Sequence, residues 1–191
     1  MEIVFATHNA NKLRELQQII PNHIKLLSLD DIGCYEEIVE DGKTIEENAL
    51  IKANYVFKHY KKACFADDTG LCVDALDGEP GVYSARYAGP QKNSHDNNQK
   101  LLDQLKGKEN REAFFKTVIA YKTSKVDKTF TGICSGKILK SLRGQDGFGY
   151  DPLFQPNGFK TTFAEMPPET KNKISHRGLA THKFIEFLKK S

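Results

Sequence analysis

The sequence predicts an α/β protein with a mixed central sheet flanked by helices. Short apolar runs, typical of buried strands, alternate with longer segments whose apolar residues recur at helical spacing. The expected order is strand–helix, strand–helix, strands, helix, hairpin, helix, which favours an α/β sandwich over an all-α or all-β fold. No repeat, linker or low-complexity segment interrupts the chain. We therefore expect residues 1–191 to form a single domain.

The first half of the chain supplies two strand–helix pairs. Residues 2–6 form a mostly apolar run, and an amphipathic helix follows until Pro21 stops it. Residues 24–29 suggest a second strand. Thr44 and Glu47 then form a capping box at the start of a helix that runs to about residue 60.

The second half supplies the other strands and helices. Residues 63–66 read as a strand that ends in a tight turn at Asp67 and Asp68. A helix is expected to start at Asn93 or Ser94 and to close at Gly107. Residues 113–121 and 128–139 predict a hairpin, and the last helix is expected to start near Ser175.

Composition excludes several classes of protein. Hydrophobic content of 39% and charged content of 28% are ordinary for a soluble globular protein. A net charge of +3 is too small to argue by itself for nucleic-acid binding. No apolar stretch is long enough to span a membrane, and the first residues lack the layout of a signal peptide. The four cysteines show no metal-type spacing, so we expect reduced thiols in the cytoplasm.

The turn after the first strand is a candidate anion site. A strand, a polar turn and a helix start bring free N–H groups and the helix dipole together. Thr7 and Asn9 add neutral hydrogen-bonding groups, and Lys12 adds a positive charge within the first turn. The alternative is an Asn9 that only caps the helix and a Lys12 on the surface.

Carboxylates gather in two places. Asp67 and Asp68 are adjacent and repel one another unless a cation or a proton lies between them. An acidic segment at residues 30–41 could add a metal-binding carboxylate, or both places could be solvated surface. Lys52 falls on the polar face of its predicted helix, so periodicity alone predicts a surface lysine.

A glycine-rich loop at residues 143–152 carries two aromatic residues. Phe148 and Tyr150 could sandwich a flat ring, or could anchor a small core. Farther along, Lys171, His176 and Arg177 cluster before or at the start of the last helix. Alone, that cluster is an ordinary basic turn.

Taken together, six motifs resemble the inosine triphosphate pyrophosphatase family, whose members hydrolyse non-canonical purine nucleotides such as dITP, ITP and XTP. They occur in the family's order over nearly the whole chain. His8 stands where Gly is common, Thr69 where Ser is common, and Ile45 where Phe is frequent; none of these departures removes a needed functional group. The six motifs are Thr7-His8-Asn9-Ala10-Asn11-Lys12; Glu40-Asp41-Gly42-Lys43-Thr44 with Glu47-Asn48-Ala49; Ala66-Asp67-Asp68-Thr69-Gly70-Leu71; Pro80-Gly81-Val82-Tyr83-Ser84-Ala85-Arg86-Tyr87; Gly147-Phe148-Gly149-Tyr150-Asp151-Pro152; and Ile174-Ser175-His176-Arg177-Gly178.

The resemblance implies two lobes around a substrate cleft, a homodimer, and Mg²⁺-dependent cleavage of a nucleoside triphosphate to the monophosphate and pyrophosphate. It implies that Asp68 is the catalytic acidic residue and that Asp68 and Glu40 bind the metal, with Glu36 and Glu37 as rivals of Glu40. Lys52 is expected to neutralise phosphate charge. The residues expected to hold the phosphates and sugar are Thr7, His8, Asn9, Ala10, Asn11, Lys12 and Thr69. Those expected to form the nucleoside pocket are Phe148, Gly149, Tyr150, Asp151, Lys171, His176 and Arg177.

Base selection follows from hydrogen-bonding logic. Hypoxanthine and xanthine present an acceptor oxygen at C6, whereas adenine presents a donor amine, so donors from His176 and Arg177 would favour the former. Two rival functions stay open at this point. One is a metal-dependent hydrolase of modified pyrimidine nucleotides. The other is a nucleic-acid-binding module, which would need a contiguous basic patch where this chain interleaves its charges.

Overall fold

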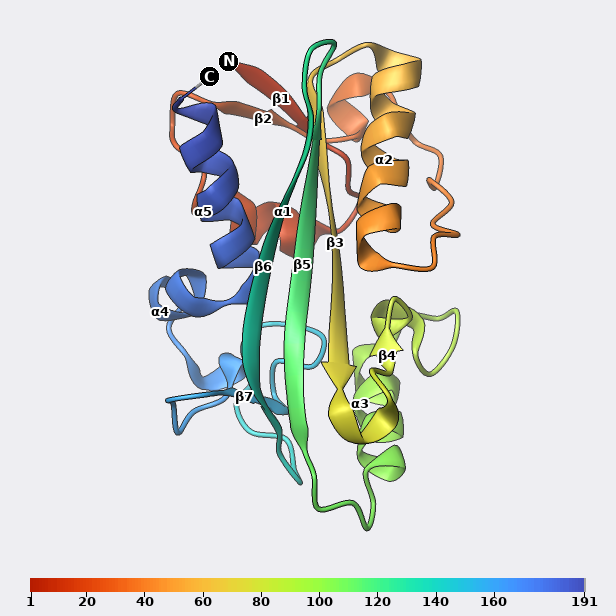
Figure 1. The fold of residues 1–191 in the computed structure, drawn as a ribbon, viewed down its shortest axis with the longest axis vertical. Coiled ribbons are helices and arrows are strands. Elements are labelled where there is room, and N and C mark those ends of the chain that lie inside the picture. The colour runs from red at the N-terminus through yellow and green to blue at the C-terminus, as the bar shows by residue number, and fades with distance from the viewer. Residues whose placement is uncertain (191) are drawn as a thin grey trace. The chain divides into compact units, whose positions relative to one another are not determined.

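The chain folds around a mixed sheet with the hydrogen-bonded strand order β2-β1-β3-β5-β6-β7, and β4 pairs with β3. The computed structural model describes residues 1–190. Strand β1 is parallel to both β2 and β3, whereas β4 is antiparallel to β3 and β7 is antiparallel to β6. Helices flank this sheet, which confirms the predicted α/β class (Figure 1).

The strands are β1 (Glu2–Phe5), β2 (Lys25–Leu27), β3 (Cys64–Val73), β4 (Pro80–Gly81), β5 (Glu112–Lys122), β6 (Asp127–Ile138) and β7 (Phe154–Pro156). The helices are α1 (Ala10–Gln17), α2 (Ile45–Tyr60), α3 (Ser94–Gln104), α4 (Pro168–Ile174) and α5 (His176–Leu188). Within residues 1–190, no helix has the length and apolar character needed to cross a bilayer.

The chain divides into two compact units that are interleaved in sequence. Unit 1 comprises residues 1–68, 117–132 and the chain from residue 177 onward; unit 2 comprises residues 69–116 and 133–176. Strands β3, β5 and β6 each contribute residues to both units. A single cooperative domain over residues 1–191 therefore stays a prediction.

Unit 1 buries both faces of its strands, which explains their near-continuous apolar runs. Phe5 and Phe65 stack with ring centroids 4.7 Å apart, and Phe184 of α5 packs against Phe65 at 4.9 Å. Leu16 of α1 belongs to the same cluster, so α1 and α5 share this face. Helix α2 lies across the strands from α5 (Figure 1), and the Cys64 thiol reaches its backbone.

Unit 2 has its own core between α3 and the sheet. Leu101 and Leu105, at the C-terminal end of α3, are fully buried among residues of β3, β5 and β6. Phe115 of β5 lies edge-on to Phe154 at 4.8 Å. The glycine-rich loop is attached to this core, because Tyr150 of the loop and Leu153 just after it are part of the core.

Helix starts agree with the sequence prediction. Asn9 and Asn93 cap α1 and α3, and Thr44 forms its capping box with Glu47 at α2. The predicted hairpin is confirmed as β5 and β6, since the Thr123 amide donates to the Val126 carbonyl in the turn at 2.8 Å. Helix α4 and strand β7 were not predicted, because both are short and lack a clear apolar period.

The predicted turn at Asp67 and Asp68 is wrong. Both residues lie inside β3, which continues to Val73. Gly70 does not take a positive φ, so this glycine makes no turn. Pairing decides the outcome: β3 bonds to β1 around Cys64 and Phe65 and to β4 around Leu71, which keeps the intervening backbone extended.

Candidate active site

The loop before α1 is ordered by its own side chains. The Asn9 side-chain oxygen accepts hydrogen bonds from the Asn11 and Lys12 amides at 3.0 and 3.2 Å. The Asn9 amide in turn donates to the Thr7 hydroxyl at 3.1 Å, while the side chains of His8 and Ala10 are exposed. The capping alternative for Asn9 is thus confirmed. The backbone amides of Asn11 and Lys12, which we expected to face an anion, therefore donate to the side chain of Asn9.

Lys12 is not the surface lysine of the alternative interpretation. Its ammonium group lies 3.0 Å from Asp67 Oδ1, and the two side chains are only 14% and 1% exposed. The other Asp67 oxygen receives the Arg177 Nε–H group at 3.2 Å, and Arg177 Nη1 also pairs with Glu15. Four buried or half-buried charges of alternating sign therefore connect α1, β3 and α5 in unit 1: Lys12, Asp67, Arg177 and Glu15.

These contacts set the ionisation of the Asp67 group. Burial alone would raise the pKa of Asp67, but Lys12, Arg177 and Lys52 outweigh burial and hold it well below its ordinary value. For Lys12 the balance is reversed, because burial lowers its pKa more than Asp67 raises it. Each oxygen of the Asp67 carboxylate thus faces a cation, and these contacts favour its ionised form.

Asp68, the next residue, belongs to a second group of charges. Lys52 Nζ lies 2.6 Å from Glu40 Oε2 and 3.6 Å from Asp68 Oδ1. Burial raises the pKa of Asp68 more than Lys52 lowers it. For Lys52, burial works toward a lower pKa, but Asp68 and Glu40 outweigh it and the pKa is raised. Two carboxylates and one ammonium leave this group with a net charge of −1 when all are ionised.

Lys52 is buried, so its prediction as a surface residue is wrong. The loop before α2 covers this face of the helix. The Gly42 amide donates to Asn48 Oδ1 at 2.9 Å, and a Cβ added at Gly42 would lie 2.6 Å from that oxygen. The close approach brings Glu40 of the same loop to Lys52. Periodicity could not detect a loop that packs on the polar face of a helix.

The structure separates Glu40 from its two rivals. Glu40 is the acid that contacts Lys52, whereas the Glu36 carboxylate accepts a hydrogen bond from the Tyr55 hydroxyl at 2.6 Å. Glu37 is exposed. Of the three acids, Glu40 is the one whose lysine partner also contacts Asp68.

The Asp68 group fits a divalent cation of the kind that binds together with phosphates. Asp68 Oδ2 is buried and has no hydrogen-bond partner among residues 1–190. No group of three or more His, Cys, Asp or Glu side chains in that range could hold a metal by itself. Mg²⁺ in phosphate-processing sites is held by one or two carboxylates plus the substrate phosphates. Asp68 and Glu40 meet that requirement; Asp67, with both oxygens paired to cations, does not.

Unit 2 carries the other predicted residues, on the glycine-rich loop and α4. Asp151 Oδ2 accepts hydrogen bonds from the Phe148 amide at 2.9 Å and from Lys171 Nζ at 2.8 Å. Lys171 Nζ also lies 5.5 Å from the centroid of the half-buried Phe148 ring. A Cβ at Gly147 would lie 2.2 Å from Asp151 Oδ2, so the loop needs a glycine there. Lys171 lies within α4 rather than in the expected turn.

The structure places Tyr150 in the core instead of on a stacking surface. Its side chain is buried, and its hydroxyl donates to the Ser84 carbonyl at 2.8 Å. Tyr150 is therefore the core anchor of the alternative interpretation, and Phe148 is the aromatic residue of this loop that stays half-exposed.

His176 and Arg177, expected as neighbouring donors to a base, have different surroundings. The buried His176 ring stacks on Phe115 in unit 2, with centroids 4.4 Å apart and planes 13° from parallel. Arg177 belongs to unit 1 and donates to two carboxylates there. Thr69, expected to hold phosphate, is half-buried within β3.

Two residues of the charge network were missed. Asp67 was noted as a repelling neighbour of Asp68 and as a carboxylate beside the metal, not as a partner of Lys12 and Arg177, and Glu15 was not singled out. A signal for Glu15 was available: it lies three positions after Lys12 on one helix, and residues at that spacing share a face. Its partner Arg177 lies 162 residues away, which no local pattern reveals.

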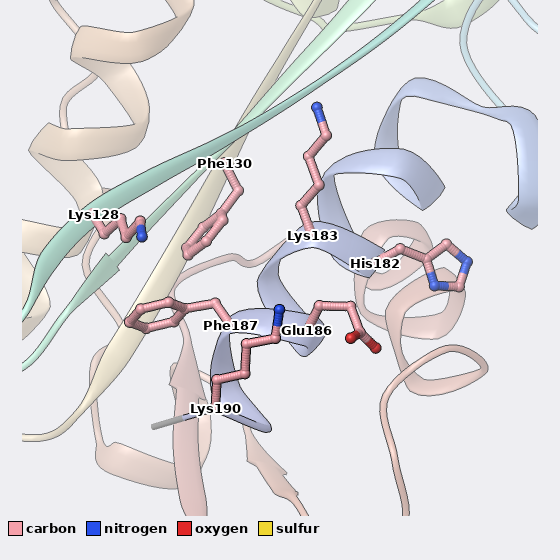
Figure 2. A pocket seen from close by; sticks show the side chains of 7 residues that line it. All are labelled: Lys128, Phe130, His182, Lys183, Glu186, Phe187 and Lys190. Carbon is pink, nitrogen blue, oxygen red and sulfur yellow. The ribbon is translucent and has the colours of Figure 1, made fainter.

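A surface pocket of about 530 Å³ lies between β6 and α5, apart from the predicted residues (Figure 2). Lys128 and Phe130 of β6 line one side of it, and Phe187 of α5 lies opposite. None of the residues predicted to bind substrate or metal lines this pocket. The charged groups described above, and not this hollow, are the candidate active site of unit 1.

Comparison with known proteins identifies the family. The chain is 58% identical to the dITP/XTP pyrophosphatase of Christiangramia forsetii over 190 residues, which cover 100% of both chains. Among solved structures, it is similar to the Staphylococcus aureus Ham1 protein, with a TM-score of 0.91 and 38% identity over 100% of this chain and 99% of that one. A HAM1 protein from Coxiella burnetii gives a TM-score of 0.92 and 36% identity, with 100% of each chain covered. Since the profile of the Ham1 family also matches residues 3–187, this chain belongs to the Ham1 family.

Proposed function

We propose that this protein is a nucleoside-triphosphate pyrophosphatase that hydrolyses ITP, dITP and XTP to the monophosphate and pyrophosphate. The names of its relatives support the substrate class. The observation that carries the proposal is the buried Asp68 carboxylate beside Lys52 and Glu40, with one oxygen that has no hydrogen-bond partner among residues 1–190. A buried carboxylate with an oxygen that has no hydrogen-bond partner is suited to bind a cation or to accept a proton.

In the proposed mechanism, Asp68 orients the attacking water and accepts its proton. One oxygen of this buried carboxylate has no hydrogen-bond partner among residues 1–190, which leaves it able to accept that proton. Asp68 and Glu40 would hold Mg²⁺, which when bound would supply Lewis-acid stabilisation of the negative charge that develops on the phosphates. Lys52, held beside Asp68, neutralises part of the same charge.

Lys12 is proposed to bind the phosphates from the start of α1. Asp67 holds its ammonium group in place, and most of the side chain is buried. Thr7 and the exposed residues His8, Asn9, Ala10 and Asn11 complete this end of the proposed site. A positive group at a helix N-terminus favours an anion, because the dipole and the charge act in the same direction.

The base is proposed to stack on Phe148 and to be selected by donors from His176 and Arg177. Stacking does not distinguish purines, since every base has a π-face. Donors toward the C6 oxygen would reject adenine, because an unmet buried donor costs about 1–3 kcal/mol. Arg177 now donates to Asp67 and Glu15, so contact with a base would require it to exchange a carboxylate for the base oxygen.

Pyrophosphate release from a panel of nucleotides tests this function. We expect hydrolysis of ITP, dITP and XTP at rates well above those for ATP and GTP, and loss of activity when EDTA removes Mg²⁺. Preference for modified pyrimidine triphosphates would favour the rival hydrolase. Salt-dependent affinity for DNA or RNA without hydrolysis of ITP would favour a binding module.

The expected cytoplasmic homodimer is part of the same proposal. Its support is the resemblance to the family and four cysteines that are all free. Sedimentation of the purified protein would test the dimer, and a monomer at micromolar concentration would contradict it.

A further inference from the structure

A buried asparagine on α3 contacts the glycine-rich loop of unit 2. Asn98 is 5% exposed, and its side-chain amide donates to the Gly149 carbonyl at 2.9 Å. Its side-chain oxygen is also buried and has no hydrogen-bond partner among the described residues. One side chain therefore makes a specific contact to the loop and leaves its other polar atom unsatisfied.

If core packing alone determined which residue occupies position 98, an apolar side chain would be more stable there than asparagine. Asn98, Leu101 and Leu105 recur at helical spacing, and both leucines are fully buried in the core of unit 2. A buried polar atom without a partner destabilises the folded state. The hydrogen bond from the Asn98 amide to the Gly149 carbonyl offsets this loss of stability. It links α3 to a loop residue 51 positions away.

The loop needs such a contact because it contains three glycines with positive φ. Gly144, Gly147 and Gly149 have φ of +85°, +77° and +62°, and glycine restricts the backbone less than any other residue. Tyr150 and Asp151 anchor the loop after Gly149, and Asp151 also binds the Phe148 amide. Asn98 holds the carbonyl between these anchors.

We propose that Asn98 is a positioning residue for the nucleoside-binding loop. By holding the Gly149 carbonyl against α3, it fixes the backbone that presents Phe148 on one side and Asp151 on the other. The nucleoside-binding role of the loop rests on the proposed function. Asn98 itself does not touch the substrate, so it sets the affinity for the nucleoside and not the chemistry at the phosphates.

The test replaces Asn98 with leucine, which has the same number of side-chain heavy atoms with the same branching and cannot donate. We expect the order parameters of the Gly147 and Gly149 amides, measured by ¹⁵N relaxation, to fall below about 0.6 while those of α3 stay near 0.85. KM for ITP should rise about tenfold, with kcat within about twofold of the unmodified protein, because a loosened loop presents its groups less accurately. Gln99→Leu makes the same chemical change at the next, exposed position and should alter none of these quantities.

Two results would overturn the inference. One is an ordered loop and an unchanged KM in Asn98→Leu. The other is a loss of kcat and of thermal stability with KM unchanged, which would make Asn98 merely structural. If that variant does not fold, Asn98→Asp keeps the volume, removes the donor and is expected to give the same loss of loop order and the same rise in KM. The relaxation measurement needs no turnover, so an unmodified protein that leaves ITP intact would refute the proposed function separately from the loop contact.

Discussion

Asp67 and Asp68 are adjacent in sequence, yet the structure gives them opposite electrostatic surroundings. Each oxygen of Asp67 contacts a cation, and the pKa of Asp67 is lowered. Asp68 instead contacts Lys52 at 3.6 Å through one oxygen, and burial raises its pKa. Successive side chains of a strand point to opposite faces, so two neighbours can meet entirely different partners. Asp67 therefore binds the side chains of Lys12 and Arg177. Asp68 keeps one oxygen without a partner among residues 1–190, and in the proposed function this oxygen binds the metal or the water.

Replacing Asp68 with asparagine should abolish hydrolysis of ITP and leave the fold intact. The side chains are nearly isosteric, and the lost charge is the one that the metal and the water need. We expect kcat to fall about a thousandfold, within the range of general acid–base effects, while the circular dichroism spectrum stays unchanged. Asp74→Asn, the same change at an exposed site just beyond β3, should retain activity. Activity near that of the unmodified protein in Asp68→Asn would disprove the assignment.

Replacing Asp67 with asparagine should instead destabilise the protein. The change leaves Arg177 and Lys12 buried without their shared counter-charge, and breaking a buried ion pair costs about 3–5 kcal/mol. Urea denaturation measures the effect as a lower midpoint with an unchanged slope. Glu2→Gln removes an exposed ion pair with Lys25 and should leave the free energy of unfolding almost unchanged, because solvent screens such a pair. Equal effects of both variants would argue against this role of Asp67.

Arg177→Ala tests how the base is selected. If Arg177 donates to the C6 oxygen, its removal lowers kcat/KM for ITP, relieves the penalty against ATP and narrows the ratio between them. If Arg177 serves only to hold Asp67 and Glu15, both substrates lose activity in parallel. We expect the ratio to narrow. An unchanged ratio of kcat/KM values would remove Arg177 from base recognition.

Among the elements, the start of α2 decides where Glu40 lies. The capping box of Thr44 and Glu47 orients the incoming chain, and Gly42 packs against Asn48 so closely that a side chain does not fit. Together they bring the loop back over the helix face that carries Lys52. A helix cap and a glycine thus control the second carboxylate of the proposed metal site.

Gly42→Ala should displace this loop and weaken the response to Mg²⁺. The added methyl group would meet Asn48 Oδ1 and Glu47 Cβ at 2.6 and 2.8 Å, so the loop must move. We expect the Mg²⁺ concentration for half-maximal pyrophosphate release to rise about tenfold, as for other changes in groups that orient metal ligands. Lys43→Ala, one residue later and exposed, is the control. An unchanged Mg²⁺ response in Gly42→Ala would mean that Glu40 does not bind the metal.

For the whole molecule, the interleaving of the two units predicts cooperative unfolding. Strands β3, β5 and β6 each supply residues to both units, so neither unit can lose its strands without breaking those of the other. We expect a single calorimetric transition with equal calorimetric and van't Hoff enthalpies. Two separated transitions would contradict the expectation of one domain over residues 1–191.

The sequence by itself determined the local structure and the family. Helix caps at Asn9, Thr44 and Asn93 and the hairpin of β5 and β6 follow from short-range signals, because capping and turn formation involve residues three or four apart. The six ordered motifs pointed to the same family as the comparisons, and they contain Asp68, Glu40 and Lys12.

Only the tertiary structure decided which charged groups pair and which side chains are buried. Lys52 lies on a polar helix face and is nevertheless covered by a loop. The side chain of Tyr150 belongs to the glycine-rich loop but is buried in the core of unit 2. Asp67 meets Arg177 across 110 residues of sequence. Such outcomes depend on how distant elements pack, since burial and long-range ion pairs arise from contacts that no local period records. Sequence therefore predicted the candidate site residues, and the fold determined how deeply each one is buried and which charged groups it contacts.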